Sequence, residues 1–190
     1  MDRTADRASD RAPRALQPYL PFGTEGYRER ASRIPGVGVL YAFASGERGA
    51  CPKAVPDGCT DVVFGVGPRD VEVLLGGTVL AASDWRFDAN RSWVGCRFDP
   101  AAAVLPDGLA PKDLVAHDLL LSGDAYGPVL EESLFNAEGA SERMAVLEAF
   151  LSGREAAASN RDLTAASDLE RYVRRRIYAT DGAITMAMLA

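Results

Sequence analysis

Short β-type segments separated by turn residues fill positions 36–98 and limit the folds open to this chain. Each segment is rich in β-branched, aromatic or aliphatic residues, and each is bounded by turn-forming residues: 37–44, 60–64, 71–75 and 92–98. Strands that recur at this spacing predict an antiparallel β-barrel or sandwich. No alternation of strand and helix appears in this stretch, which argues against a parallel nucleotide-binding sheet.

Two turn signals indicate where these strands begin and end. Pro-Asp-Gly at 56–58 leads directly into the strand expected at 60–64. Gly-Gly at 76–77 fits a two-residue hairpin turn with positive φ at both positions. The hairpin predicts that the chain returns along 78–82 as the neighbouring strand.

Helical signals replace the strand pattern after residue 99. Asp99 and Pro100 form a capping carboxylate followed by proline, which predicts one or two helical turns over 101–105. A further short piece in a helix-like context should start at 110 and end near 121, followed by amphipathic helices at 126–137 and 140–151. The predicted fold class is therefore α+β, a small antiparallel barrel or sandwich followed by a helical segment.

Composition and charge indicate a globular protein and argue against two classes, proteins that bind nucleic acid over their whole surface and proteins that span a membrane. The 190 residues are 47% hydrophobic and 25% charged, which suits one globular domain with a small appendage. The net charge of −6 is uneven, because residues 161–190 hold five basic and four acidic side chains while the other 160 hold 16 and 23. An acidic body argues against nucleic-acid binding over the whole surface. No apolar run approaches the ~20 residues of a membrane span, and no signal peptide is visible, so we expect a cytoplasmic protein without membrane contact.

The residues that carry chemistry do not form a recognisable catalytic set. The single histidine, His117, cannot build a cupin-type metal site, which needs two or three imidazoles, so we expect no metal, no cofactor and no enzymatic activity. Cys59 lies beside Asp61, whose charge would raise the thiol pKa and so disfavour reactivity. The three cysteines include no CxxC pair, and we interpret them as packed or idle thiols.

Charged and aromatic residues of the strand region leave two interpretations open. Arg97 lies in an apolar strand, so its side chain either points outward or is buried with a partner such as Asp61 or Asp99. In one interpretation Arg97 forms a structural ion pair, and in the other it contacts an anion of the ligand. Trp85 and Trp93 line a pocket in one interpretation and belong to the core in the other.

An arginine cluster marks the helix expected at 167–178. Arg171 and Arg175 share one face of that helix and Arg174 adjoins it, a spacing suited to contacts with DNA phosphates. A solvated helix face is an equally good interpretation of these residues alone.

Three segments resemble parts of the AraC/XylS family of transcription regulators. LERYVRRRIYATDGAITMAMLA at 169–190 resembles the opening of the family's helix-turn-helix DNA-binding domain. VPDGCTDVVFGVG at 55–67 and WVGCRFDPAAA at 93–103 resemble a sensor region, found in a subset of these regulators, with P-D-G-C-x-D and G-x-R-F-x-P-x-A-A patterns. The resemblance implies a cupin-like β-barrel that senses an effector or dimerises, then a helical linker and a DNA-binding domain whose recognition helices would lie beyond Ala190.

The expected organisation follows from the strand and helix patterns together with this resemblance. We expect a frayed tail at 1–17, a β-rich sensor barrel at 18–100 and a helical part of the sensor or dimerisation domain at 101–152. A linker at 153–166 then leads to the first helices of a truncated helix-turn-helix domain at 167–190.

The function expected from the sequence is that of an effector-sensing and dimerisation region of a bacterial AraC-like transcription regulator. Its partners would be an unknown small-molecule effector, a second copy of the chain, and DNA through the C-terminal domain of the full-length protein. The residues expected to face the effector are Cys59, Asp61, Trp85, Trp93, Cys96 and Arg97. A small cupin-like enzyme and a domain that dimerises without sensing anything remain as alternatives.

Overall fold

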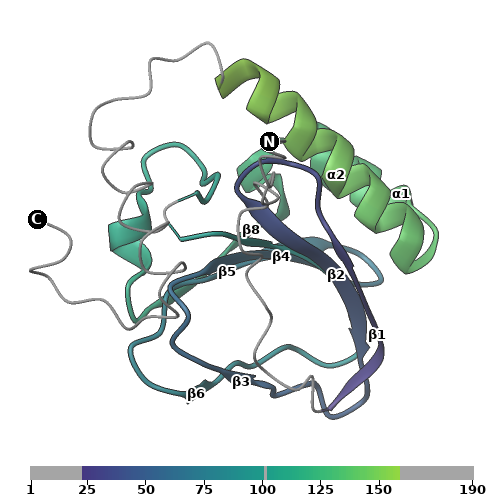
Figure 1. Cartoon of the computed structure of the whole chain (residues 1–190). Helices are drawn as coiled ribbons and strands as arrows, with labels where there is room; N and C mark the ends of the chain where they lie inside the picture. The colour runs from purple at the N-terminus through teal and green to yellow at the C-terminus, as the bar shows by residue number, and fades with distance from the viewer. Residues whose placement is uncertain (1–22, 101, 159–190) are drawn as a thin grey trace, which may run out of the picture. The chain divides into compact units, whose positions relative to one another are not determined.

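A six-stranded antiparallel sheet is the framework of the computed structural model, which describes residues 23–100 and 102–158 (Figure 1). In spatial order its strands are β1 (Thr24–Ala31), β2 (Val37–Ser45), β7 (Ser92–Phe98), β4 (Thr60–Val66), β5 (Val71–Gly76) and β8 (Asp118–Ser122). Two further strands, β3 (Lys53–Ala54) and β6 (Ser83–Asp84), pair as a short ribbon. The helices are η1 (Pro111–Leu114), η2 (Gly123–Tyr126), α1 (Pro128–Asn136) and α2 (Gly139–Ala158).

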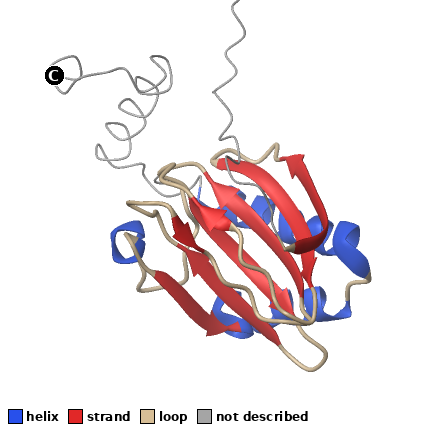
Figure 2. Cartoon of the chain, turned by 90° about the horizontal axis from the view of Figure 1, so that it is seen from below, coloured by secondary structure: helices blue, strands red, loops and turns tan. Residues whose placement is uncertain are grey.

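Each face of the large sheet buries its own apolar cluster. Along β4 and β7, Val62, Phe64, Val94 and Cys96 point to the face covered by α1 and α2, where Leu134 and Leu147 complete the cluster. Val63 and Trp93 alternate with them and point to the opposite face. Figure 2 shows the helices behind the sheet in a view of that second face. The central strands are therefore buried on both sides, and their apolar runs are explained by this double coverage.

The α+β class and the order of a sheet followed by helices are confirmed. The four strands predicted at 37–44, 60–64, 71–75 and 92–98 match β2, β4, β5 and β7 to within two residues at each end. The two amphipathic helices match α1 and α2. Among the described strands the sheet is open, because β1 and β8 form its two edges and do not pair with each other.

The hairpin predicted at Gly76-Gly77 is wrong. Strand β5 ends at Gly76, residues 77–82 form no strand, and neither glycine has a positive φ. A Cβ at Gly77 would lie 1.8 Å from the Leu114 carbonyl oxygen, so glycine is required there by close backbone approach. The antiparallel neighbour of β5 is β8, more than 40 residues further along the chain.

The helical prediction for 110–121 is wrong in its second half. Only η1 is helical, and Asp118–Ser122 forms strand β8 with alternating burial. The turns predicted over 101–105 do not form at 102–105, and β1 was not predicted because its sequence, TEGYRERA, is polar. Helix α2 extends to Ala158, six residues into the predicted linker. No described helix is both long and apolar enough to cross a membrane.

Candidate functional site

A buried arginine on β7 and an aspartate on β4 form the centre of a polar cluster on the face opposite the helices. Arg97 and Asp61 are directly opposed in the β4–β7 register, so both side chains project from the same face. Arg97 Nε and Nη2 lie 3.1 and 2.9 Å from Asp61 Oδ2, and Nε lies 3.3 Å from Oδ1. The two residues are only 3% and 6% exposed. The ion pair with Asp61 expected as one interpretation of Arg97 is therefore present.

The Pro-Asp-Gly turn before β4 is tied to the same arginine. Arg97 Nη1 donates to Asp57 Oδ2 at 3.0 Å, while Asp57 Oδ1 accepts the backbone N–H of Cys59 at 2.9 Å. The second contact closes the turn locally, and Gly58 supplies its positive φ of 74°. Asp57 thus links a turn to a strand 40 residues away, a role that its place in a turn motif did not reveal.

Tyr41 on β2 is the fourth member of the cluster, and it was not predicted as a site residue from the sequence. Its hydroxyl donates to Asp61 Oδ1 at 2.9 Å, so both carboxylate oxygens of Asp61 are hydrogen-bonded. Burial raises the pKa of Asp61, whereas Arg97 and the Tyr41 hydroxyl oppose this shift by stabilising the charged form. The sequence around a tyrosine in a strand does not show whether its hydroxyl makes a buried hydrogen bond or its ring only packs against apolar neighbours.

The charge balance of the cluster is unfavourable to an added anion. Two carboxylates, Asp57 and Asp61, contact the single guanidinium of Arg97. An added anion at Arg97 would therefore lie next to two acidic side chains that already contact the guanidinium. Contact of Arg97 with a ligand anion, the other interpretation, stays a prediction that this geometry does not favour.

Aromatic side chains fill the rest of this face beneath the β3–β6 ribbon. Tyr41 lies across Gly95, where an added Cβ would be 2.7 Å from its ring, and Trp93 lies across Gly65 in the same way at 2.5 Å. Trp93 Nε1 donates to Ser45 Oγ at 3.0 Å. Trp85 Nε1, by contrast, is buried and lacks a hydrogen-bond partner, the one such side-chain atom among the described residues.

The structure divides the six residues predicted to face an effector. Asp61, Arg97, Trp85 and Trp93 are on the ribbon-side face, and all are buried. Cys96 points to the helical side, where its Sγ lies 3.8 Å from the Val62 carbonyl oxygen. Cys59 is buried at the turn, and burial together with Asp57 raises the pKa of its thiol. Neither thiol belongs to the apolar cluster that contains Trp85 and Trp93.

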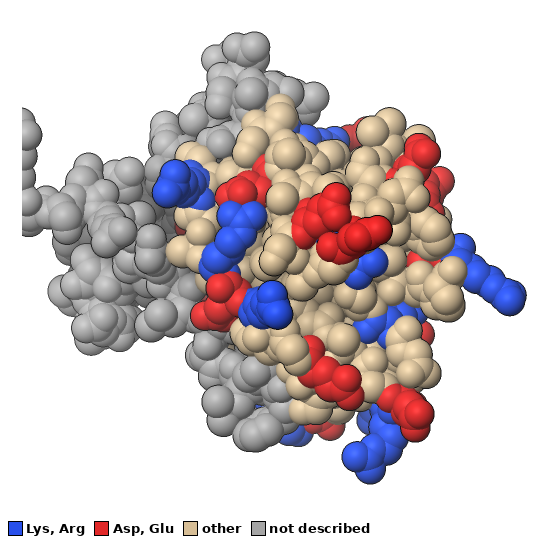
Figure 3. Space-filling view, turned by 90° about the vertical axis from the view of Figure 1, so that its right-hand side faces the viewer, with Lys and Arg blue, Asp and Glu red and all other residues tan. Residues whose placement is uncertain are grey.

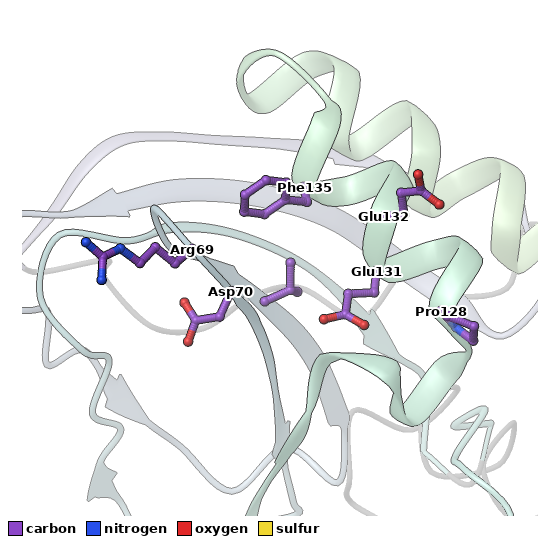
Figure 4. Close-up of a pocket in the computed structure, with 7 residues that line it drawn as sticks. Arg69, Asp70, Pro128, Glu131, Glu132 and Phe135 are labelled. Atoms are coloured by element: carbon purple, nitrogen blue, oxygen red, sulfur yellow. The ribbon is translucent and has the colours of Figure 1, made fainter.

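A surface groove lies elsewhere, between the β4–β5 turn and α1 (Figure 4). It is open to solvent, has a volume of about 340 Å³ and is lined by Arg69, Asp70, Val71, Pro128, Glu131, Glu132 and Phe135. None of the six predicted residues contributes to it. Its walls come from two segments some 60 residues apart, so no local sequence pattern could have indicated it.

The remaining sequence predictions fall outside this cluster. His117 directly precedes β8, and its backbone N–H donates to the Leu114 carbonyl oxygen at 3.2 Å. Among the described residues, no group of three or more histidine, cysteine or acidic side chains is arranged to hold a metal ion. Arg171, Arg174 and Arg175 lie outside the described residues. On the face drawn in Figure 3, basic and acidic side chains of the described residues are interspersed.

Comparison of the chain with protein-family models, with curated proteins and with solved structures finds no match.

Proposed function

We propose that this chain is the effector-sensing and dimerisation region of a bacterial AraC-like transcription regulator, acting on a helix-turn-helix DNA-binding domain that begins within 167–190. One observation carries the proposal beyond the sequence resemblance. The two sensor-like segments, 55–67 and 93–103, meet at the buried Arg97, which both Asp57 and Asp61 contact. Residues of both segments thus contact one another, which supports the interpretation that the two segments belong to one sensor region.

The sheet offers a physical route from such a cluster to the helices. Strand β7 places Arg97 on one face and the adjacent residues Cys96 and Phe98 in the core that α1 and α2 cover. A ligand that favours one arrangement of the ribbon-side cluster would bias the packing on the other side of the same strand. A change in the helices would then alter the spacing of two DNA-binding domains in a dimer.

The test is a thermal-shift screen of the 190-residue chain against a metabolite panel enriched in amines and polyols, the groups that donate hydrogen bonds. A ligand at 100 times its dissociation constant stabilises the fold by about 2.7 kcal/mol, which a melting curve resolves. Tyr41→Phe, which removes only the hydroxyl on Asp61, should reduce the shift. Tyr126→Phe removes a hydroxyl bonded to the Val104 carbonyl on the helical side, and should not.

Two outcomes would count against sensing. If no compound raises the melting temperature, or if Tyr41→Phe and Tyr126→Phe respond alike, the ribbon-side face is not an effector site. A stoichiometric content of iron, zinc or manganese in the purified protein would instead favour a cupin-like enzyme.

A second candidate function is dimerisation without sensing. It is favoured by the burial of all six predicted ligand residues, and aromatic side chains already occupy the ribbon-side face on which four of them lie. This alternative predicts a stable dimer in light scattering together with an empty thermal-shift screen.

A further inference from the structure

The two edges of the six-stranded sheet differ in how they are protected against pairing with another strand. Edge strand β1 carries Arg28, Glu29 and Arg30, and its register with β2 shifts between Glu25 and Arg28. Charged side chains and an irregular register are the features by which natural sheets block pairing at an edge. Strand β1 is therefore a protected edge.

Strand β8 has the opposite character. Its sequence is Asp-Leu-Leu-Leu-Ser, and Leu120 is 61% exposed. Its one charged residue, Asp118, accepts the backbone N–H of Gly77 at 3.2 Å. Among the described strands, β8 pairs with β5 alone, so its outer backbone groups have no strand partner.

Further apolar side chains surround this edge. Val115, in the segment leading to β8, is 41% exposed, and Leu80, in the loop after β5, is 71% exposed. A hydrogen bond of 2.9 Å from Ala116 N–H to the Thr78 carbonyl joins the two segments. Three of the five exposed large apolar residues in the described chain thus belong to β8 or to the two segments beside it.

We propose that β8 pairs antiparallel with β8 of a second copy of this chain, around a two-fold axis at Leu120, and joins two six-stranded sheets edge to edge. In that register Leu120 faces its own counterpart, Leu119 faces Leu121, and Asp118 faces Ser122, whose hydroxyl can donate to the carboxylate. No like charges oppose each other, so the strand is complementary to itself. The inference goes beyond the proposed function, which leaves the dimer interface open.

The helical layer is a poorer surface for self-association. Residues 123–154 contain six acidic and two basic side chains. Two copies that met through this layer would bring like charges together, and such contacts cost affinity. The charge distribution therefore favours the β8 edge as the place where a second copy docks.

Register-specific disulfide formation tests the geometry in the full chain carrying Cys51→Ser, which removes the exposed native thiol. Directly opposed residues in an antiparallel pair have Cα atoms about 4.5–5.5 Å apart, within disulfide range. Leu120→Cys should therefore cross-link rapidly under mild oxidation. Ser122→Cys should not, because its copy lies four residues away, about 13 Å along the strand. Asp118→Cys combined with Ser122→Cys should cross-link again.

Light scattering of the unoxidised protein gives a second, independent measurement. Leu120→Lys places two positive charges opposite each other and should raise the dimer dissociation constant by at least about tenfold. Val129→Lys makes the same kind of change on α1, at a residue 76% exposed, and should leave the dimer intact.

Three results would overturn the pairing. They are a wild-type chain that is monomeric at about 100 µM, a dimer whose dissociation constant does not change with Leu120→Lys, and equal cross-linking by Leu120→Cys and Ser122→Cys. A monomeric chain would also remove the dimerisation role from the regulator proposal, whereas the other two results leave that proposal to be decided by the ligand screen. Conversely, an empty screen with a Leu120-dependent dimer would leave the β8 interface in place and remove the sensing role.

Discussion

Arg97 shows at the scale of single residues how a buried charge is accommodated. Its planar guanidinium reaches Asp61 with Nε and Nη2 and Asp57 with Nη1, so three donors serve two carboxylates in different directions. A lysine ammonium could not reproduce this forked geometry. Arginine between two carboxylates therefore holds a turn and two strands together at one point.

Replacement of Arg97 by methionine should lower the free energy of unfolding by about 3–5 kcal/mol, because Asp61 would remain buried without its counter-charge. Urea denaturation monitored by tryptophan fluorescence measures the loss. Lys53→Met is the matched control, since Lys53 pairs with Asp84 at the exposed ribbon, and it should leave the midpoint unchanged. Equal midpoints for Arg97→Met and wild type would contradict the structural role assigned to the cluster.

The three cysteines should differ in reactivity. Cys51 is exposed, whereas burial raises the pKa of both Cys59 and Cys96 and so disfavours the reactive thiolate at these two positions. A thiol reagent at pH 8 should modify one cysteine quickly in the native chain and all three after denaturation. Cys51→Ser should abolish the fast phase. A second fast-reacting thiol would show that the turn or the helical core opens readily.

The site was only partly predictable from the sequence for reasons visible in these residues. The sequence offered two acidic partners for Arg97, of which Asp61 was one. An arginine in an apolar strand requires a counter-charge, but its own position does not indicate which acid supplies it. Asp57 looked like a turn former, and nothing in a single sequence connects it to a residue 40 positions away. Tyr41 and the groove beside α1 depend on strand register and helix placement, which local patterns do not specify.

At the scale of elements, predictions succeeded where the residue pattern itself marks a strand and failed where the pairing of a strand had to be inferred. Strand β7 was predicted with both of its ends because its apolar run is bounded by polar and turn residues. Gly76-Gly77 looked like a hairpin because two glycines permit positive φ, but β5 pairs with β8 instead. Residues 118–122 carry three consecutive leucines, which suit a helix or a strand equally until the partner is known.

Two glycine substitutions should have opposite effects that depend on what surrounds them. Gly77→Ala would drive a Cβ into the Leu114 and His117 carbonyl oxygens and should cost about 1–3 kcal/mol or more of stability. Gly153→Ala, on α2 with nothing within 4 Å, should gain up to about 1 kcal/mol from helix propensity. Thermal or urea unfolding of both variants provides the comparison. A neutral Gly77→Ala would refute the close approach of the two segments.

At the scale of the whole described chain, stability should decrease from the centre of the sheet outward. Strand β7 is paired on both sides, by β2 and β4, and both of its faces are buried. Amide hydrogen exchange should therefore be slowest in β7 and in its neighbours, and fastest in the β3–β6 ribbon and in β1. The exchange of β8 should slow as protein concentration rises, if a second copy covers its edge. Uniform exchange across the sheet would contradict this ordering.

The contacts of Tyr41 with Gly95 and of Trp93 with Gly65 also constrain how such a sheet could change over time. Each large ring occupies the space that a side chain on the neighbouring strand would need, so neither glycine can be exchanged alone without displacing an aromatic group. A smaller residue at 93 together with a larger one at 65 restores the volume. Substitutions on this face should therefore be tolerated in compensating pairs. A library that varies positions 65 and 93 together should recover folded combinations that neither single-site library contains.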